Sequence, residues 1–131
     1  MTGMELIRDI DSCRLQPGQC ALWWLGQHGF AVKLGGTVLY IDPLLSDLPG
    51  RRVPPLLGPS QVANARLVLG SHDHADHIDR PAWPALAAAS PDARFVVPLL
   101  LIFHFIAIAQ AWRWQAEGSL SAGRQPQSSA A

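Results

Sequence analysis

Short apolar segments separated by glycine and proline dominate the first three quarters of the chain. Such segments, rich in aromatic and β-branched residues, are typical of strands. The segments expected as strands are 20–25, 30–34, 37–41, 67–70 and 95–97. Gly35-Gly36 between the second and third segments indicates a two-residue hairpin turn, so the first three strands are expected to form an antiparallel meander. Residues 4–15 fit either a strand or a short helix.

Two helices are expected after the meander. Ser60 is a candidate N-cap for a short helix over 61–65, and Asp79 is a candidate N-cap for a helix with Pro81 in its first turn. Alanine-rich sequence over 83–89 favours the second helix. Because strand, helix and strand then follow one another, the segment from 67 to 97 predicts a βαβ unit with parallel strands. The predicted fold class is therefore mixed α/β (α+β).

Composition changes sharply at Pro98. Nine of the ten acidic residues precede it, and only Glu117 follows. We expect a partial folded domain over 1–98, an apolar helical segment over 99–117 and a disordered tail over 118–131. The apolar run is shorter than the roughly 20 residues that span a bilayer, so a membrane span is not favoured. Self-association of the chain through this run is the favoured alternative. His104 within it is expected to be a core or lipid-facing residue.

The net charge bears on the class of partner, and the cysteines bear on the cellular compartment. The formal net charge is zero and the pI is near 7.0, so electrostatics do not favour a nucleic-acid partner. Cys13 and Cys20 have no secretory signal before them, and we expect reduced thiols in a cytoplasmic protein. Arg51 and Arg52, in a proline-rich loop over 44–59, could meet an anionic small-molecule substrate, although two solvated arginines are the simpler interpretation.

The segment 71–79 is the densest in groups that bind metals or move protons. His72, His74, Asp76 and His77 form the pattern His-x-His-x-Asp-His directly after an apolar strand. Imidazole and carboxylate suit zinc, manganese or iron. In an extended chain His72, His74 and Asp76 would point to one side, and a turn after the second histidine would bring His77 round to Asp76. The sequence therefore predicts a metal site on a loop at the end of a strand.

This motif resembles the metal motif of the metallo-β-lactamase superfamily. The segments 21–26, 29–30, 35–37 and 41–42 resemble the branch that contains L-ascorbate-6-phosphate lactonase. The resemblance implies an αββα sandwich, of which this chain carries the N-terminal half, and a metal-dependent hydrolase of a lactone, amide or phosphoester. It also implies zinc or manganese, one or two ions, with one ion on His72 and His74 and a second on Asp76 and His77. Asp42 would lie beside these ligands, and Asp76 would also be the catalytic group that orients or deprotonates the attacking water.

The later ligands of that superfamily, two histidines and a bridging aspartate, have no clear counterpart after Pro98. We therefore expect a truncated or frame-shifted member with weak or no turnover, because a catalytic site takes about three protein ligands and an open position. The alternative is a non-catalytic metal-binding or structural fragment, either oligomeric or membrane-associated.

Overall fold

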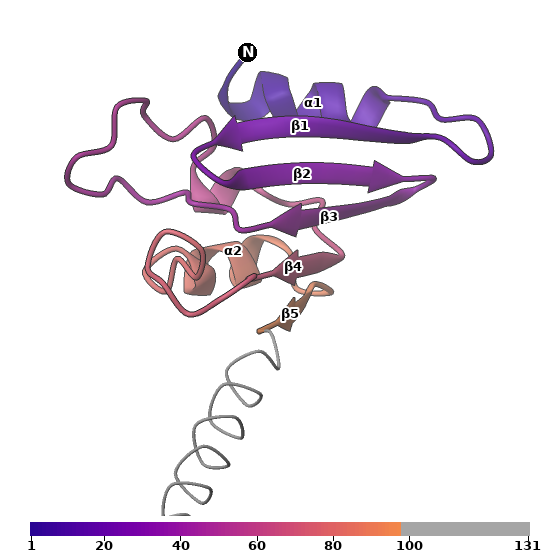
Figure 1. Cartoon of the computed structure of the whole chain (residues 1–131). Coiled ribbons are helices and arrows are strands. Elements are labelled where there is room, and N and C mark those ends of the chain that lie inside the picture. Colours follow the sequence, from indigo (N-terminus) through magenta and orange to yellow (C-terminus); the bar gives the residue numbers. More distant parts are fainter. Residues whose placement is uncertain (98–131) are drawn as a thin grey trace, which may run out of the picture. The chain divides into compact units, whose positions relative to one another are not determined.

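The computed structural model describes residues 1–97, and these form a five-stranded sheet with helices packed against it (Figure 1). The strands, in their order across the sheet, are β1 (Cys20–Gly26), β2 (Gly29–Leu34), β3 (Thr37–Ile41), β4 (Leu67–Leu69) and β5 (Arg94–Val96). The helices are α1 (Gly3–Ser12), the short 3-10 helix η1 (Pro59–Gln61) and α2 (Trp83–Ala89). The predicted mixed α/β class is confirmed. The segment expected over 99–117, with His104, and the tail over 118–131 lie outside the described residues.

The sheet is mixed, as the sequence predicts. β1, β2 and β3 pair antiparallel, whereas β3, β4 and β5 pair parallel. Leu34 is opposite Thr37, which confirms the two-residue Gly35-Gly36 turn, and Gly35 has the positive φ of 58° that glycine adopts easily. These directions bring the C-terminal ends of β1, β3, β4 and β5 to one edge of the sheet. The β1–β2 turn, the residue after β3 and the loop after β4 therefore share that edge.

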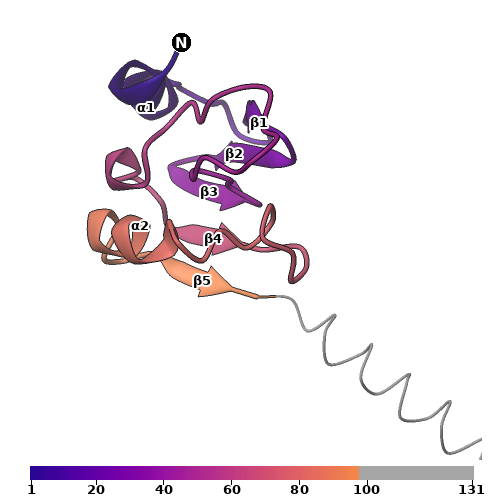
Figure 2. The same cartoon turned by 90° about the vertical axis from the view of Figure 1, so that its left-hand side faces the viewer.

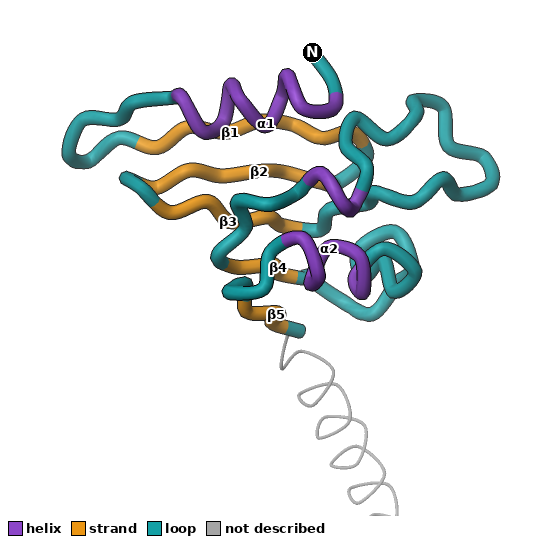
Figure 3. The backbone as a smooth tube through the Cα atoms, turned by 180° about the vertical axis from the view of Figure 1, so that it is seen from behind, coloured by secondary structure: helices purple, strands orange, loops and turns teal. Residues whose placement is uncertain are grey.

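One face of the sheet is covered by helices. A row of side chains crosses all five strands on this face: Trp23, Ala31, Tyr40, Val68 and Phe95. This row belongs to the same core as the buried side of α1 and the buried Leu86 of α2. Figure 2 shows both helices on the same side of the sheet, and Figure 3 views the molecule from that side. The opposite face carries exposed apolar side chains, among them Leu22, Trp24 and Leu34.

Lys33 joins the sheet to the first helix. It is only 5% exposed, and its ammonium donates to the carbonyl oxygens of Ile10 at 2.7 Å and Asp11 at 2.9 Å. These carbonyls belong to the last turn of α1, which has no further helical turn to satisfy them. A cation at the C-terminal end of a helix also interacts favourably with the helix dipole. Lys33 therefore fixes where α1 ends against the sheet.

Two local expectations change. Residues 4–15, which fitted a strand or a helix, form α1 over most of their length, because Leu6, Ile7 and Ile10 share one buried side. The helix predicted over 61–65 is wrong: only η1, which ends at Gln61, forms there, and the Gln61 side chain accepts a hydrogen bond from the Gly58 N–H at 2.8 Å.

The second helix ends at Ala89 as expected but begins later than expected, at Trp83, so Pro81 precedes it and Ala82, not Asp79, is its N-cap residue. Asp79 forms the preceding turn, in which its carbonyl accepts from the N–H groups of Ala82 and Trp83. The carboxylate of Asp79 accepts hydrogen bonds mainly from a loop that is distant in the sequence. No helix among residues 1–97 is long and apolar enough to cross a bilayer.

Candidate metal centre

The histidine-rich loop folds back on the end of β4. The N–H groups of His77 and Ile78 both donate to the carbonyl of His74, at 3.0 and 2.8 Å, so the chain turns sharply after the second histidine. Ile78 is buried, and it packs so close to Gly70 that a Cβ on that glycine would lie 2.7 Å from Ile78 Cγ1. The absence of a side chain at Gly70 therefore lets the loop close against the strand that carries it.

Asp42 anchors this loop from the neighbouring strand. It follows β3 directly, and its backbone N–H donates to the Leu69 carbonyl at 2.8 Å. One carboxylate oxygen accepts the Ser71 N–H at 2.6 Å, and the other accepts the Ser71 hydroxyl at 2.6 Å and Nδ1 of His77 at 2.8 Å. Asp42 has a φ of 47° in the left-handed region, which an aspartate adopts at some cost. That conformation places the carboxylate against the loop.

The hydrogen bonds at Asp42 also set its ionisation. Burial alone would raise the pKa of this carboxyl group, but the Ser71 hydroxyl, His77 and the Ser71 N–H together hold the pKa below its usual 3.8. The carboxylate form is therefore favoured in the folded protein. This fits a group whose task is to accept hydrogen bonds and to hold an imidazole in place.

The lowered pKa makes a prediction about acid stability. A carboxyl group with a depressed folded-state pKa stabilises the fold above its unfolded pKa, and that contribution is lost as the pH falls through the folded value. We expect Asp42→Asn to lower the free energy of unfolding of the chelator-treated protein near neutral pH, and the deficit to shrink below about pH 4. Urea unfolding of both proteins at a series of pH values measures this difference. A deficit that is the same at every pH would contradict the assignment.

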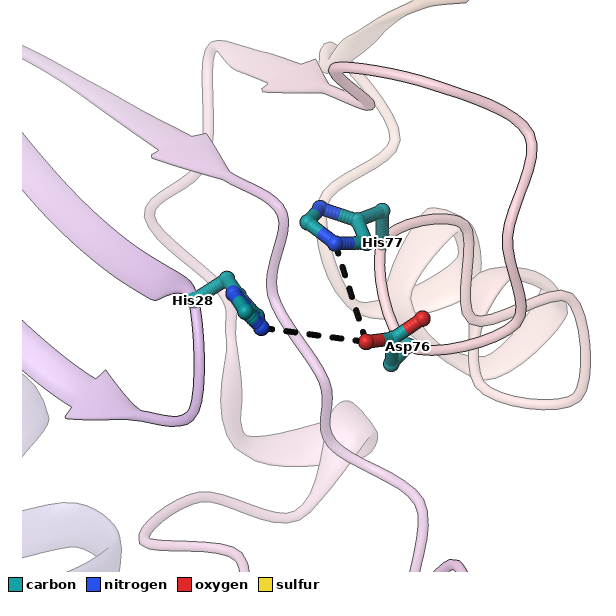
Figure 4. A group of neighbouring side chains, drawn as sticks. All are labelled: His28, Asp76 and His77. Atoms are coloured by element: carbon teal, nitrogen blue, oxygen red, sulfur yellow. Dashed lines mark ion pairs between the residues drawn. The ribbon is translucent and has the colours of Figure 1, made fainter.

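His77 is held with one nitrogen turned toward Asp76. Because a carboxylate accepts only, Nδ1 of His77 donates to Asp42, and a neutral ring then keeps its lone pair on Nε2. This Nε2 lies 3.6 Å from Oδ2 of Asp76. Nε2 of His28 lies 3.8 Å from the same oxygen, and the rings of His28 and His77 are neighbours, with centroids 4.6 Å apart (Figure 4). The ligand atoms of His28, Asp76 and His77 all lie within 4.8 Å of one another, so one ion could contact all three.

The other two predicted ligands stand beside this group. Nε2 of His72 is 2.9 Å from Nδ1 of His74, and the ring centroids of His72 and His77 are 3.9 Å apart. The Ser71 hydroxyl lies 3.1 Å from Nδ1 of both His72 and His77. The structure thus brings all four residues of the motif, and Asp42, into one cluster. The assignment of His72 and His74 to one ion, and of Asp76 and His77 to a second, stays a prediction.

His28 was not among the residues predicted from the sequence. It lies in the β1–β2 turn, where Gly26 and Gln27 both have positive φ, 92° and 52°. A signal for it was present in the predicted meander. If β3 ends at the site, β2 must begin there and β1 must end there, so a histidine between β1 and β2 has to lie at the same edge.

These features define a mixed α/β protein with an imidazole and carboxylate cluster, able to hold a metal ion, at one edge of its sheet. No protein-family model matches the chain. The chain is similar to the probable L-ascorbate-6-phosphate lactonase UlaG of Shigella boydii serotype 4 (strain Sb227), with 30% identity over 124 aligned residues, covering 73% of this chain and 35% of the relative. The same-named proteins of Escherichia coli O139:H28 and O9:H4 are 29% identical over the same shares.

The chain spans about a third of the length of these curated relatives, since the alignment covers 35% of each. The similarity supports a distant relation to the lactonase-like branch that the sequence motif resembles. It does not test the expected truncation, the domain boundaries or the cytoplasmic location, which stay predictions.

Proposed function

We propose that this chain carries the metal-binding part of a metal-dependent hydrolase that acts on a lactone. The observation that carries the proposal is the group formed by His28, Asp76 and His77, with ligand atoms within 4.8 Å of one another. Three protein ligands with one position left open are typical of catalytic zinc sites. The reaction class comes from the relatives, which are named as probable lactonases.

The donor set fits a divalent ion such as zinc or manganese. Two imidazoles and one carboxylate are ligands that both metals accept, and the remaining ring nitrogen of His77 is already bonded to Asp42, as is usual for a ligating histidine. Such an ion supplies Lewis acidity and lowers the pKa of water. His72 and His74 would hold a second ion where two are present.

Each residue of the cluster then has a role. Asp42 keeps the His77 ring oriented and its Nε2 lone pair available, and Ser71 braces Asp42 through two hydrogen bonds. Oδ2 of Asp76 lies near both His28 and His77, and from there Asp76 can bind an ion and can orient the attacking water or take a proton from it. The names of the relatives favour lactone opening, and hydrolysis of an amide or a phosphoester is the runner-up.

A non-catalytic metal-binding role is the second candidate. The alignment covers 35% of each relative, so the similarity by itself does not assign the relatives' reaction to this chain. In this case the chain would bind an ion through the same residues without turnover.

The test combines metal analysis with hydrolysis. The full chain is loaded with zinc or manganese, freed of unbound ion by gel filtration and analysed for metal, then assayed with a lactone, an amide and a phosphodiester. We expect a bound ion and weak hydrolysis of the lactone, with both lost after chelation and in the double variant His28→Ala/His77→Ala. Stoichiometric metal without any turnover selects the non-catalytic role. Absence of bound metal after loading would refute both.

A further inference from the structure

A pocket of about 300 Å³ is formed in part by the β1–β2 turn that also carries His28. It is lined by Trp24, Gln27, Gly50, Arg52 and Val53. Gln27 directly precedes His28, so the β1–β2 turn contributes to both the pocket and the metal-binding group. A molecule held in this pocket would therefore be close to the ion-binding histidine of the same turn.

The pocket has an excess of positive charge. Among the described residues, Arg52 is the only charged side chain that lines it, and Arg51 is its neighbour in the chain. Within residues 1–97 no carboxylate lies within 4.0 Å of either guanidinium group. Nη2 of Arg51 is buried and has no hydrogen-bond acceptor in this part of the chain. A buried donor without an acceptor costs free energy, and Arg52 is exposed, so its charge is free to meet an anion that enters the pocket.

Arg51 also holds the pocket wall in place. Its Nη1 donates to the carbonyls of Leu44 at 2.8 Å and Ser46 at 3.0 Å, and its Nε donates to Val53 at 2.5 Å. These bonds close the loop on itself across the segment that carries Arg52. Gly26, in the β1–β2 turn, lies beside this guanidinium group: a Cβ on Gly26 would lie 3.5 Å from Nη2 of Arg51. The loop and the turn are thereby set side by side before any ligand binds.

The opposite wall is an aromatic surface. Trp24 is 60% exposed, yet its indole N–H donates to the Gln27 carbonyl at 2.9 Å, which fixes the ring against the turn. A fixed indole offers apolar area at little cost in side-chain entropy. It could pack against the carbon skeleton of a small molecule whose charged end lies at Arg52.

We propose that this pocket is the subsite for an anionic oxygen group of the substrate, a phosphate or a carboxylate, with Arg52 as its ion-pair partner and Trp24 as its apolar wall. A guanidinium group matches the geometry of either anion through two parallel hydrogen bonds. The inference rests on the proposed function in one respect, since it takes the anion to be part of the molecule that is hydrolysed next to His28.

The experiment uses the full chain after chelator treatment, so that no anion can bind through a metal. Inorganic phosphate and acetate are titrated separately at constant ionic strength, while ¹H–¹⁵N NMR spectra follow the indole N–H of Trp24 and the side-chain amide of Gln27. We expect saturable shifts of both signals. Arg52→Ala should weaken the binding by at least about tenfold, the effect of one lost charge-assisted contact.

Arg94→Ala is the matched control, because Arg94 is exposed at the start of β5, at the opposite edge of the sheet from the β1–β2 turn. It removes the same charge and should leave the affinity unchanged. Tighter binding of phosphate assigns the subsite to phosphate esters, and tighter binding of acetate assigns it to carboxylates. Absence of saturable shifts with both anions, or equal weakening by the two variants, would overturn the proposal. Because the protein is metal-free, this failure is separate from failure of metal loading.

Discussion

Asp76→Asn is expected to weaken the affinity of the chain for zinc by at least about 100-fold, beyond the 10- to 100-fold typical of partners outside the ligand set. Oδ2 of Asp76 lies 3.6 Å from Nε2 of His77 and 3.8 Å from Nε2 of His28, so it is the atom that links the two imidazoles. The substitution keeps the shape of the side chain and removes its negative charge. Competition with a chromophoric chelator measures the affinity.

Asp73→Asn is the control for this experiment. Asp73 lies in the same loop and loses the same charge, but its carboxylate pairs with Arg80 and does not belong to the metal-binding group. We expect its zinc affinity to stay within about threefold of the parent chain, since a partly exposed ion pair contributes little. Equal losses in the two variants would mean that the loop attracts cations through its overall charge and that Asp76 is no ligand.

The part of the site that the sequence predicts is the part encoded locally. His72, His74, Asp76 and His77 lie within one loop, so their spacing alone indicates that they meet, and an apolar strand before them indicates where. Asp42 came from the resemblance and lies on a different strand. The structure gives the physical reason for its position: parallel pairing of β3 with β4 puts the residue after β3 beside the residues after β4.

The features that sequence reasoning missed depend on pairings across the sheet or on competition between segments. His28 reaches the cluster because β1 and β2 are antiparallel, so the turn between them lies at the same edge of the sheet as the end of β3. The predicted meander implies this position, but only when the direction of each strand is followed. The pattern over 4–15 is too short to separate a helix from a strand until one side of it packs on a sheet. Asp79 has the side chain of an N-cap, but the N–H groups that it satisfies belong mainly to a distant loop.

That distant loop makes Asp79 the residue whose loss should cost the most stability. Its carboxylate is 1% exposed and accepts the N–H groups of Leu45 and Ser46 at 2.8 and 2.7 Å and the Ser46 hydroxyl at 2.6 Å. The Ala82 N–H adds a weaker bond at 3.3 Å. These bonds tie the end of the histidine loop to the start of the loop that carries Arg51. Within residues 1–97 no cation pairs with this buried carboxylate, and its acceptor capacity is filled by these hydrogen bonds instead.

Asp79→Ala is therefore expected to lower the free energy of unfolding by about 3 to 5 kcal/mol, because it leaves a buried N–H at Leu45 and a partly buried N–H at Ser46 without their acceptor and opens a cavity. That is a large fraction of the stability of an ordinary domain, so urea denaturation should show a reduced midpoint or partial unfolding already in buffer. Asp92→Ala is the matched control: its side chain is 82% exposed, its one partner is Arg66 at 3.4 Å, and the expected change is below about 1 kcal/mol. If the two alanine variants unfold at the same urea concentration, Asp79 does not hold the two loops together, and the arrangement of the anion pocket beside the metal centre would need another cause.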